Sequence, residues 1–128
     1  MPDPTQKVRV LVIDDEPMIR TMMARLLRKH EVTVTDGGKA ALAELEAGRR
    51  FDLILCDVSM PLMTGIELFI TLKEHYPEQA ARVVMMTGGV TDAKARAFLE
   101  NGVPRWVEKP CSAALLRELV EKATEQPA

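Results

Sequence analysis

The sequence predicts an α/β fold in which a doubly wound parallel sheet lies between two layers of helices. The first observation is a series of short, nearly continuous apolar or β-branched runs at residues 8–13, 32–35, 52–56, 82–86 and 105–108. Such runs are typical of strands that are buried on both faces, as in a parallel sheet. The second observation is that helix-length segments separate them, which gives five β/α units with right-handed crossovers.

A proline and several glycines mark the first two helices. Pro17 is well tolerated in a first turn, so the first helix begins there. Asp36-Gly37-Gly38 breaks the chain, and the second amphipathic helix ends near Gly48. The first helix has an apolar face at helical spacing, made of Ile19, Met22, Met23, Leu26 and Leu27. Core filling is the simplest interpretation of Met18, Met22, Met23, Met85 and Met86.

Three more helices follow. One runs from Gly65 to about Tyr76, where Pro77 stops it. The next runs from about Asp92 to Asn101, with Gly102 as its terminator. It has few large apolar residues, so we expect it to be the least firmly packed helix and a candidate moving part. Ser112 caps the last helix, whose core-facing residues are Leu115, Leu116, Leu119 and Val120.

Length and composition fit one domain over residues 1–128, with a core at about 7–123. A chain that is 47% hydrophobic and 28% charged is typical of a folded, soluble protein. Its net charge of −2 gives no case for direct binding of nucleic acid or of an anionic membrane. Apolar runs of four to six residues are too short for membrane insertion, and no signal peptide is present, so we expect a cytoplasmic protein. Cys56 and Cys111 have no metal or disulfide spacing and are interpreted as reduced thiols in the core.

Polar residues stand at the carboxyl ends of four of the predicted strands. In open parallel sheets, ligands bind at this edge. The sheet should therefore gather into one cleft Asp14, Asp15, Asp57, Thr87 and Lys109. No glycine-rich turn and no Walker-type lysine follow the first strand, which argues against a dinucleotide-binding fold.

This cleft has the chemistry of a metal and phosphoryl site. Neighbouring carboxylates repel one another by about 1 kcal/mol per pair even at the dielectric constant of water, and Lys109 offsets only one charge. Oxygen ligands without histidine or thiol favour Mg²⁺, with Mn²⁺ or Ca²⁺ as alternatives. Asp57 is the candidate nucleophile toward phosphorus. Lys109 and the hydroxyl of Thr87 can then bind the phosphoryl oxygens.

These blocks of sequence resemble one known family. Asp14-Asp15, Asp57-Val58-Ser59-Met60-Pro61-Leu62-Met63-Thr64-Gly65, Thr87-Gly88 and Lys109-Pro110 are similar, in this order, to the receiver domain of two-component response regulators. The resemblance covers about residues 7 to 123. It implies a flavodoxin-like (βα)5 fold with strand order 2-1-3-4-5 and helices on both faces.

The resemblance also implies a role for each site residue. Asp57 would accept phosphate from a phosphohistidine on a sensor histidine kinase or a histidine phosphotransfer domain. Asp15, Asp57 and the backbone carbonyl of Ser59 would bind Mg²⁺ directly, and Asp14 would act through a coordinated water. Thr87 and Lys109 would bind the phosphoryl group. Such a domain is not an enzyme in the ordinary sense, although it assists its own phosphorylation and dephosphorylation.

The same resemblance implies which surface changes on phosphorylation. Thr87 would move toward the phosphate and Trp106 would turn inward, which remodels the face made by helix 92–101, strand 105–108 and the helix after Ser112. This face could also form a homodimer, and the downstream effector is unknown. Because the family usually has a smaller aromatic residue in place of Trp106, a static tryptophan and a working switch are both open.

Three further alternatives are open. The chain could be a receiver-like interaction module that signals without phosphorylation. It could be a Mg²⁺-dependent phosphohydrolase, although enzymes with an aspartate nucleophile typically place a second aspartate two residues later, where this chain has Ser59. The segment 84–89 resembles receivers attached to hybrid histidine kinases, so the chain could also be part of a larger protein. In the family, the residues at Ser59 and Gly89 tune the phosphoaspartate lifetime.

Overall fold

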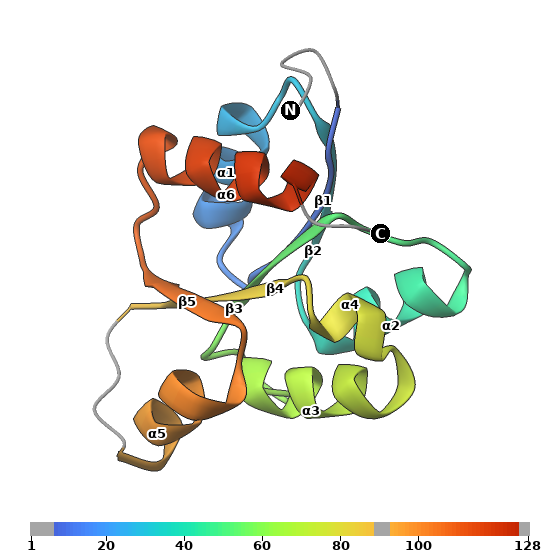
Figure 1. The fold of residues 1–128 in the computed structure, drawn as a ribbon, viewed down its shortest axis with the longest axis vertical. Coiled ribbons are helices and arrows are strands. Elements are labelled where there is room, and N and C mark those ends of the chain that lie inside the picture. The colour runs from blue at the N-terminus through green and yellow to red at the C-terminus, as the bar shows by residue number, and fades with distance from the viewer. Residues whose placement is uncertain (1–6, 89–92, 126–128) are drawn as a thin grey trace.

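The fold, seen in a computed structural model that describes residues 7–88 and 93–125, is a parallel sheet covered by helices on both faces (Figure 1). Its strands have the order β2-β1-β3-β4-β5, and every neighbouring pair is parallel. The strands are β1 (Arg9–Ile13), β2 (Glu31–Thr35), β3 (Leu53–Asp57), β4 (Val83–Thr87) and β5 (Arg105–Glu108). The helices are α1 (Pro17–Leu26), α2 (Gly38–Glu46), α3 (Gly65–His75), α4 (Pro77–Ala80), α5 (Ala93–Gly102) and α6 (Ala113–Glu125). The predicted flavodoxin-like fold and strand order are confirmed.

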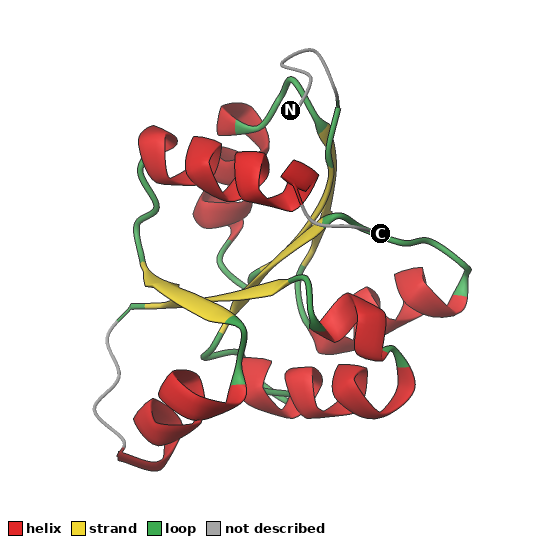
Figure 2. Cartoon of the chain, in the orientation of Figure 1, coloured by secondary structure: helices red, strands yellow, loops and turns green. Residues whose placement is uncertain are grey.

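Two hydrophobic cores lie on opposite faces of the sheet, because successive strand residues point to opposite sides. On one face Ile54 and Met85 pack under α2, α3, α4 and α5. On the other face Leu55 and Met86 pack under α1 and α6. Figure 2 shows the two helical layers, in red, on either side of the yellow strands. Both central strands β3 and β4 are buried along their whole length.

The strand register brings the carboxyl ends of the sheet together. Ile13 in β1 lies beside Cys56 in β3, and Asp57 lies beside Met86 in β4. Thr87 in turn lies beside Glu108, the last residue of β5. The loops that follow β1, β3, β4 and β5 therefore leave the sheet at one edge.

The helices differ from the prediction at two places. Pro77 ends α3 as predicted, but it also begins the short helix α4, which the sequence analysis did not predict. Gln79 holds this turn against the segment that precedes β3, since its side-chain amide accepts a hydrogen bond from the N–H of Phe51 and donates one to the Phe51 carbonyl (2.9 and 3.1 Å). Asp92, the predicted start of the next helix, lies outside the described residues, and Gly102 is the last residue of α5 rather than a terminator beyond it.

The predicted apolar face of α1 is only partly correct. Met23 and Leu27 are buried, but Met18 is 84% exposed and Leu26 is 43% exposed. Met18 is therefore not core filling, whereas Met85 and Met86 are. The helix turns Met18 and Leu26 away from the sheet. There they line a groove of about 380 Å³ together with Pro17, Thr21, Met22 and Arg25.

Other local predictions hold. The hydroxyl of Ser112 accepts a hydrogen bond from the N–H of Leu115 (3.1 Å), as expected of a helix cap. Leu116, Leu119 and Val120 face the core, while Leu115 is only half-buried. In α5, the helix expected to be weakly packed, Leu99 is the only buried residue. Its expected mobility stays a prediction.

Candidate functional site

Two buried carboxylates meet at the carboxyl edge of the sheet. Asp14 directly follows β1 and is 0% exposed, and Asp57 is the last residue of β3 and is 3% exposed. Because β1 and β3 are paired neighbours, the two side chains emerge side by side. Burial of two acidic groups at the end of an apolar strand pair is costly unless cations or hydrogen bonds compensate for it.

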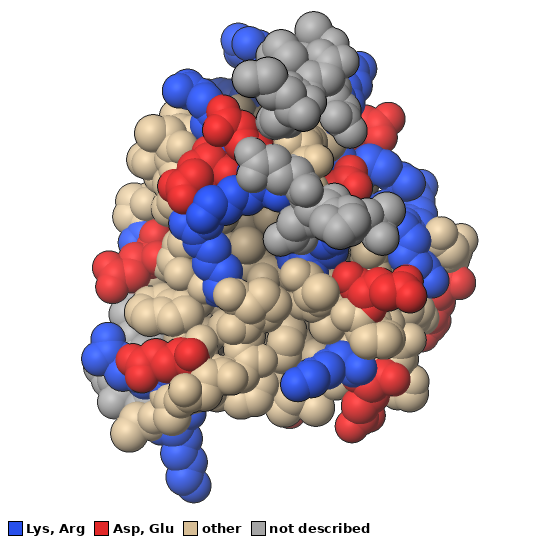
Figure 3. Space-filling view, viewed as in Figure 1, with Lys and Arg blue, Asp and Glu red and all other residues tan. Residues whose placement is uncertain are grey.

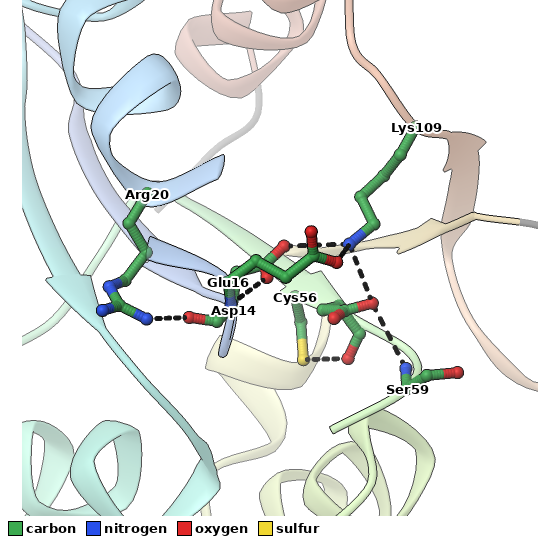
Figure 4. Close-up of polar contacts among 7 residues, drawn as sticks. Asp14, Glu16, Arg20, Cys56, Ser59 and Lys109 are labelled. Atoms are coloured by element: carbon green, nitrogen blue, oxygen red, sulfur yellow. Dashed lines mark hydrogen bonds and ion pairs between the residues drawn. The ribbon is translucent and has the colours of Figure 1, made fainter. Parts of the chain in front are cut away.

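Lys109 is the cation that reaches this pair (Figure 4). Its Nζ atom lies 3.1 Å from Oδ2 of Asp14 and 3.4 Å from Oδ1 of Asp57. A third carboxylate, that of Glu16, has its Oε1 atom 3.3 Å from the same Nζ. The backbone fixes the base of this lysine, because the N–H of Lys109 donates to the carbonyl of Thr87 (2.8 Å).

The electrostatics of Asp57 are dominated by burial. Burial raises the pKa of Asp57 from an ordinary 3.8 to about 6, and the charge of Asp14 adds to this effect. The ion pair with Lys109 and the N–H of Ser59, which donates to Oδ1 (3.2 Å), offset part of the rise. Asp57 is therefore mostly ionised at neutral pH but held in an environment that favours the neutral form.

The pKa values of Lys109 and of the two cysteines are also shifted. Burial alone would lower the pKa of Lys109, but the hydrogen bond to Asp14 and the charge of Asp57 outweigh it, so the pKa is raised and the ammonium stays charged. Burial and the two aspartates raise the pKa of the Cys56 thiol. Burial also raises the pKa of Cys111. Both cysteines are free and buried, as predicted, and neither has the character of a reactive thiolate.

Asp14 is held on all sides. Its N–H donates to the carbonyl of Thr35 in β2 (3.1 Å), and its Oδ1 accepts the N–H of Glu16 (2.9 Å). The guanidinium of Arg20 in α1 donates to the Asp14 carbonyl (2.8 Å), as Figure 4 shows. With Oδ2 bound to Lys109, the carboxylate has a partner on each oxygen. Asp14 therefore acts as a fixed anchor of the pocket.

The loop from β3 to α3 lies tightly against Asp57. The N–H of Gly65 donates to the carbonyl of Val58 (2.8 Å), and a Cβ atom at Gly65 would lie 2.2 Å from the Asp57 carbonyl oxygen. Only glycine fits here. Thr64 and Glu67 form a reciprocal capping box that starts α3. Leu62, at the tip of this loop, is fully exposed and has a positive φ of 70°.

Among the described residues, one acidic group could hold a metal ion. Carboxylate oxygens of Asp14, Glu16 and Asp57 all lie within 4.8 Å of one another. The donors are all hard oxygens, and two of the three residues are buried, so the pocket fits Mg²⁺ or a similar cation. Asp15, the predicted direct ligand, is half-buried and is not one of the three. The predicted role of the Ser59 carbonyl stays a prediction.

The two predicted switch residues lie on adjacent strands. Thr87 is buried at the end of β4 and pairs in register with Glu108. Trp106 in β5 pairs with Met85, is half-buried, and packs against the core under α5. The sheet thus connects Thr87 to Trp106 through two neighbouring strands. Movement of either side chain stays a prediction.

Sequence reasoning missed two residues of the site. Glu16 directly follows the predicted acidic pair Asp14-Asp15, so the sequence places it next to the pocket. The sequence does not indicate its contact with Lys109, which lies near the other end of the chain. Arg20 lies one helical turn into α1 and was not considered. Both reach the pocket because α1 begins at Pro17, immediately beyond the loop.

The surface adds little to the site. On the face seen in Figure 3, basic and acidic side chains are interspersed, and no large area of one sign is visible among the described residues. Among these residues, no helix has the length and apolar character needed to cross a membrane.

The sheet order defines a flavodoxin-like α/β domain, which carries a pocket of three carboxylates and one lysine at its carboxyl edge. The chain belongs to the response regulator receiver domain family, whose model matches residues 10–121.

Its relatives include proteins of receiver length and receivers of larger proteins. The chain is 37% identical over 109 residues to the two-component response regulator ORR3 of Oryza sativa subsp. indica, with 84% of this chain and 83% of that protein covered. It is 32% identical to the chemotaxis protein CheY of Pseudomonas aeruginosa, with 93% and 98% covered. The solved receiver domain of a signal transduction histidine kinase from Syntrophus aciditrophicus is 26% identical and superposes with a TM-score of 0.80, with 92% and 90% covered.

Proposed function

We propose that this chain is a phosphorylation-dependent switch of a two-component system, with Asp57 as the phosphoacceptor. The observation that carries the proposal is the position of Lys109 Nζ, 3.4 Å from an oxygen of the buried Asp57 carboxylate, which lies beside two further carboxylates, those of Asp14 and Glu16. Receiver domains pair with histidine kinases, so the donor is a phosphohistidine on a sensor kinase or a histidine phosphotransfer domain. Membership of the family supports this donor class.

The chemistry requires an ionised Asp57. One Oδ atom attacks phosphorus, the new O–P bond forms as the P–N bond to the imidazole breaks, and the imidazole nitrogen leaves with the electron pair. A pKa of about 6 leaves most of Asp57 as carboxylate at neutral pH. Lys109 is placed to offset the charge of the transferred group, and the hydroxyl of Thr87 can donate to one of its oxygens. The product is an acyl phosphate.

A divalent cation completes the charge balance. As the family resemblance implies, Asp15, Asp57 and the Ser59 carbonyl would hold it directly, and Asp14 would act through a coordinated water. When bound, Mg²⁺ supplies positive charge for the phosphoryl oxygens. In this proposal the domain is a phosphoacceptor rather than a classical enzyme, and its cytoplasmic setting and single-domain extent over 1–128 follow the sequence predictions.

The output surface would be the face of α5, β5 and α6. Its link to the acceptor is the pairing of β4, which ends in Thr87, with β5, which carries Trp106. We infer that Thr87 moves to the phosphoryl group and that Trp106 responds, which changes this face for an effector or for a second copy of the chain.

Incubation with acetyl phosphate and Mg²⁺ tests the proposal without a cognate kinase. The intact mass should increase by one phosphoryl group, and Asp57→Asn should not be labelled. Labelling of the Asp57→Asn variant would show that another residue is the phosphoacceptor. The alternative, an interaction module that works without phosphorylation, predicts no labelling of the wild-type chain. Repeated turnover of a phosphomonoester would instead indicate a phosphohydrolase.

A further inference from the structure

Glu16 has an unusual position for a helix-capping residue. It is the N-cap of α1, yet its carboxylate makes no hydrogen bond with the free N–H groups of that helix. Its Oε1 atom instead lies 3.3 Å from Nζ of Lys109, across the pocket (Figure 4). The backbone of Glu16 is fixed, because its N–H donates to Asp14 (2.9 Å) and its carbonyl accepts the N–H of Arg20 (3.1 Å).

The three carboxylates around Lys109 differ in exposure. The side chain of Asp14 is 0% exposed and that of Asp57 is 4% exposed, whereas that of Glu16 is 58% exposed. An ammonium group has three N–H donors, and three carboxylates surround this one. A phosphoryl group on Asp57 would bring further anionic oxygens to Lys109, where they compete with Asp14 and Glu16 for its N–H groups. Glu16 is the partner that water can solvate most readily after it leaves.

We propose that Glu16 is a positioning residue, which holds the ammonium group of Lys109 at the acceptor before phosphorylation and yields it to the phosphoryl group. This inference rests on the proposed function. Glu16 and the phosphoryl group carry the same charge and compete for the same cation. Glu16 therefore stabilises the unphosphorylated state, in which it holds Lys109 beside Asp57. It disfavours the phosphorylated state by the same interaction.

Beryllium fluoride, a small mimic of the phosphoryl group, allows a direct test in the presence of saturating Mg²⁺. Glu16→Gln keeps the shape of the side chain and removes its charge. We expect this variant to bind beryllium fluoride about two- to fivefold more tightly than the wild type, the size of effect typical of a half-exposed ion pair. Glu108→Gln is the matched control, because Glu108 is exposed, precedes Lys109 directly and forms no ion pair with it among the described residues. This control should match the wild type.

Separate measurement of Mg²⁺ affinity distinguishes a metal ligand from a lysine partner. Similar Mg²⁺ affinity in Glu16→Gln and Glu108→Gln, with tighter beryllium fluoride binding only in the first, supports the proposal. Equal or weaker beryllium fluoride binding by Glu16→Gln would overturn it, as would a loss of Mg²⁺ affinity without that gain. If the wild-type chain fails to bind beryllium fluoride with Mg²⁺, the proposed function itself fails, and this inference fails with it.

Discussion

Nζ of Lys109 lies 3.4 Å from Oδ1 of Asp57, and the two side chains are 12% and 4% exposed. One partly buried cation thus faces two buried carboxylates, those of Asp57 and Asp14. The fold does not cancel this imbalance by itself, and an unpaired buried charge destabilises the folded state. The same imbalance is what attracts a cation, so stability and function should be opposed at this pocket.

Replacement of Asp57 should therefore stabilise the metal-free protein. We expect Asp57→Asn to raise the free energy of unfolding by about 1 to 3 kcal/mol at pH 8 in EDTA, since a rise in pKa from 3.8 to about 6 reports the cost of ionising this group. Urea denaturation measures the difference. Asp36→Asn, at an exposed position, is the control and should change little.

The sign of the pH dependence is specific. The folded state binds the Asp57 proton more tightly than the unfolded chain, so this group favours folding below about pH 3.8, and the contribution is lost as the pH rises through about 6. The advantage of Asp57→Asn should therefore grow between these values. Mg²⁺ should stabilise the wild type more than the variant. Equal stability of the two proteins at pH 8 in EDTA would contradict the charge argument.

Gly65→Ala should disrupt the loop that supports Asp57. The added Cβ would lie 2.2 Å from the Asp57 carbonyl oxygen and 2.9 Å from Cα of Val58, both of them backbone atoms. We expect a loss of about 2 kcal/mol or more in unfolding free energy, because backbone must move. Gly37→Ala is the control, since its Cβ meets nothing within 4 Å; it should cost at most about 1 kcal/mol as a poorer helix cap. Similar costs for the two variants would refute the close approach.

Trp106 is the only tryptophan in the chain, so its fluorescence reports on β5 directly. If Thr87 and Trp106 act as the proposed switch, beryllium fluoride with Mg²⁺ should change the emission maximum of the wild type as the indole moves from its half-buried position. Thr87→Ala should bind the anion with little change in emission. An unchanged wild-type spectrum at saturation would favour a static tryptophan.

His30 should make stability depend on pH away from the site. Its Nδ1 atom accepts a hydrogen bond from the N–H of Val8 (3.1 Å), which requires the neutral ring. Burial and the charge of Lys29 lower the pKa of His30, so its contribution is present above about pH 6.5 and is lost as the pH falls through the lower folded-state value. His30→Ala should cost about 1 kcal/mol at pH 8 and less at pH 5. His75→Ala, at an exposed position, is the control and should change the unfolding free energy at pH 8 little.

The parts of the fold that follow one-dimensional patterns were predictable. The buried strands are almost continuous apolar runs, and the residues at their ends, Asp14, Asp57, Thr87 and Lys109, could be assigned to one edge because parallel strands share their direction. The motif around Asp57 also identified the family before any contact was known.

What was not predictable depends on side-chain direction in three dimensions. Met18 and Leu26 have the residue types of a core face, but the rotation of α1 places them outside. The contact of Glu16 with Lys109 depends on how two loops that are distant in sequence approach each other, which no sequence pattern reports. The short helix α4 depends on the hydrogen bonds between Gln79 and Phe51, which leave no periodic pattern in so few residues.

Chemical mapping of the acceptor tests the central claim most directly. Borohydride reduces an aspartyl phosphate to homoserine, and the tryptic peptide of residues 51–73 contains both Asp57 and Asp52, so one spectrum compares the two. After treatment with acetyl phosphate and Mg²⁺, we predict homoserine at position 57 and an unmodified aspartate at position 52. Homoserine at position 52, or at any aspartate other than Asp57, would contradict the account.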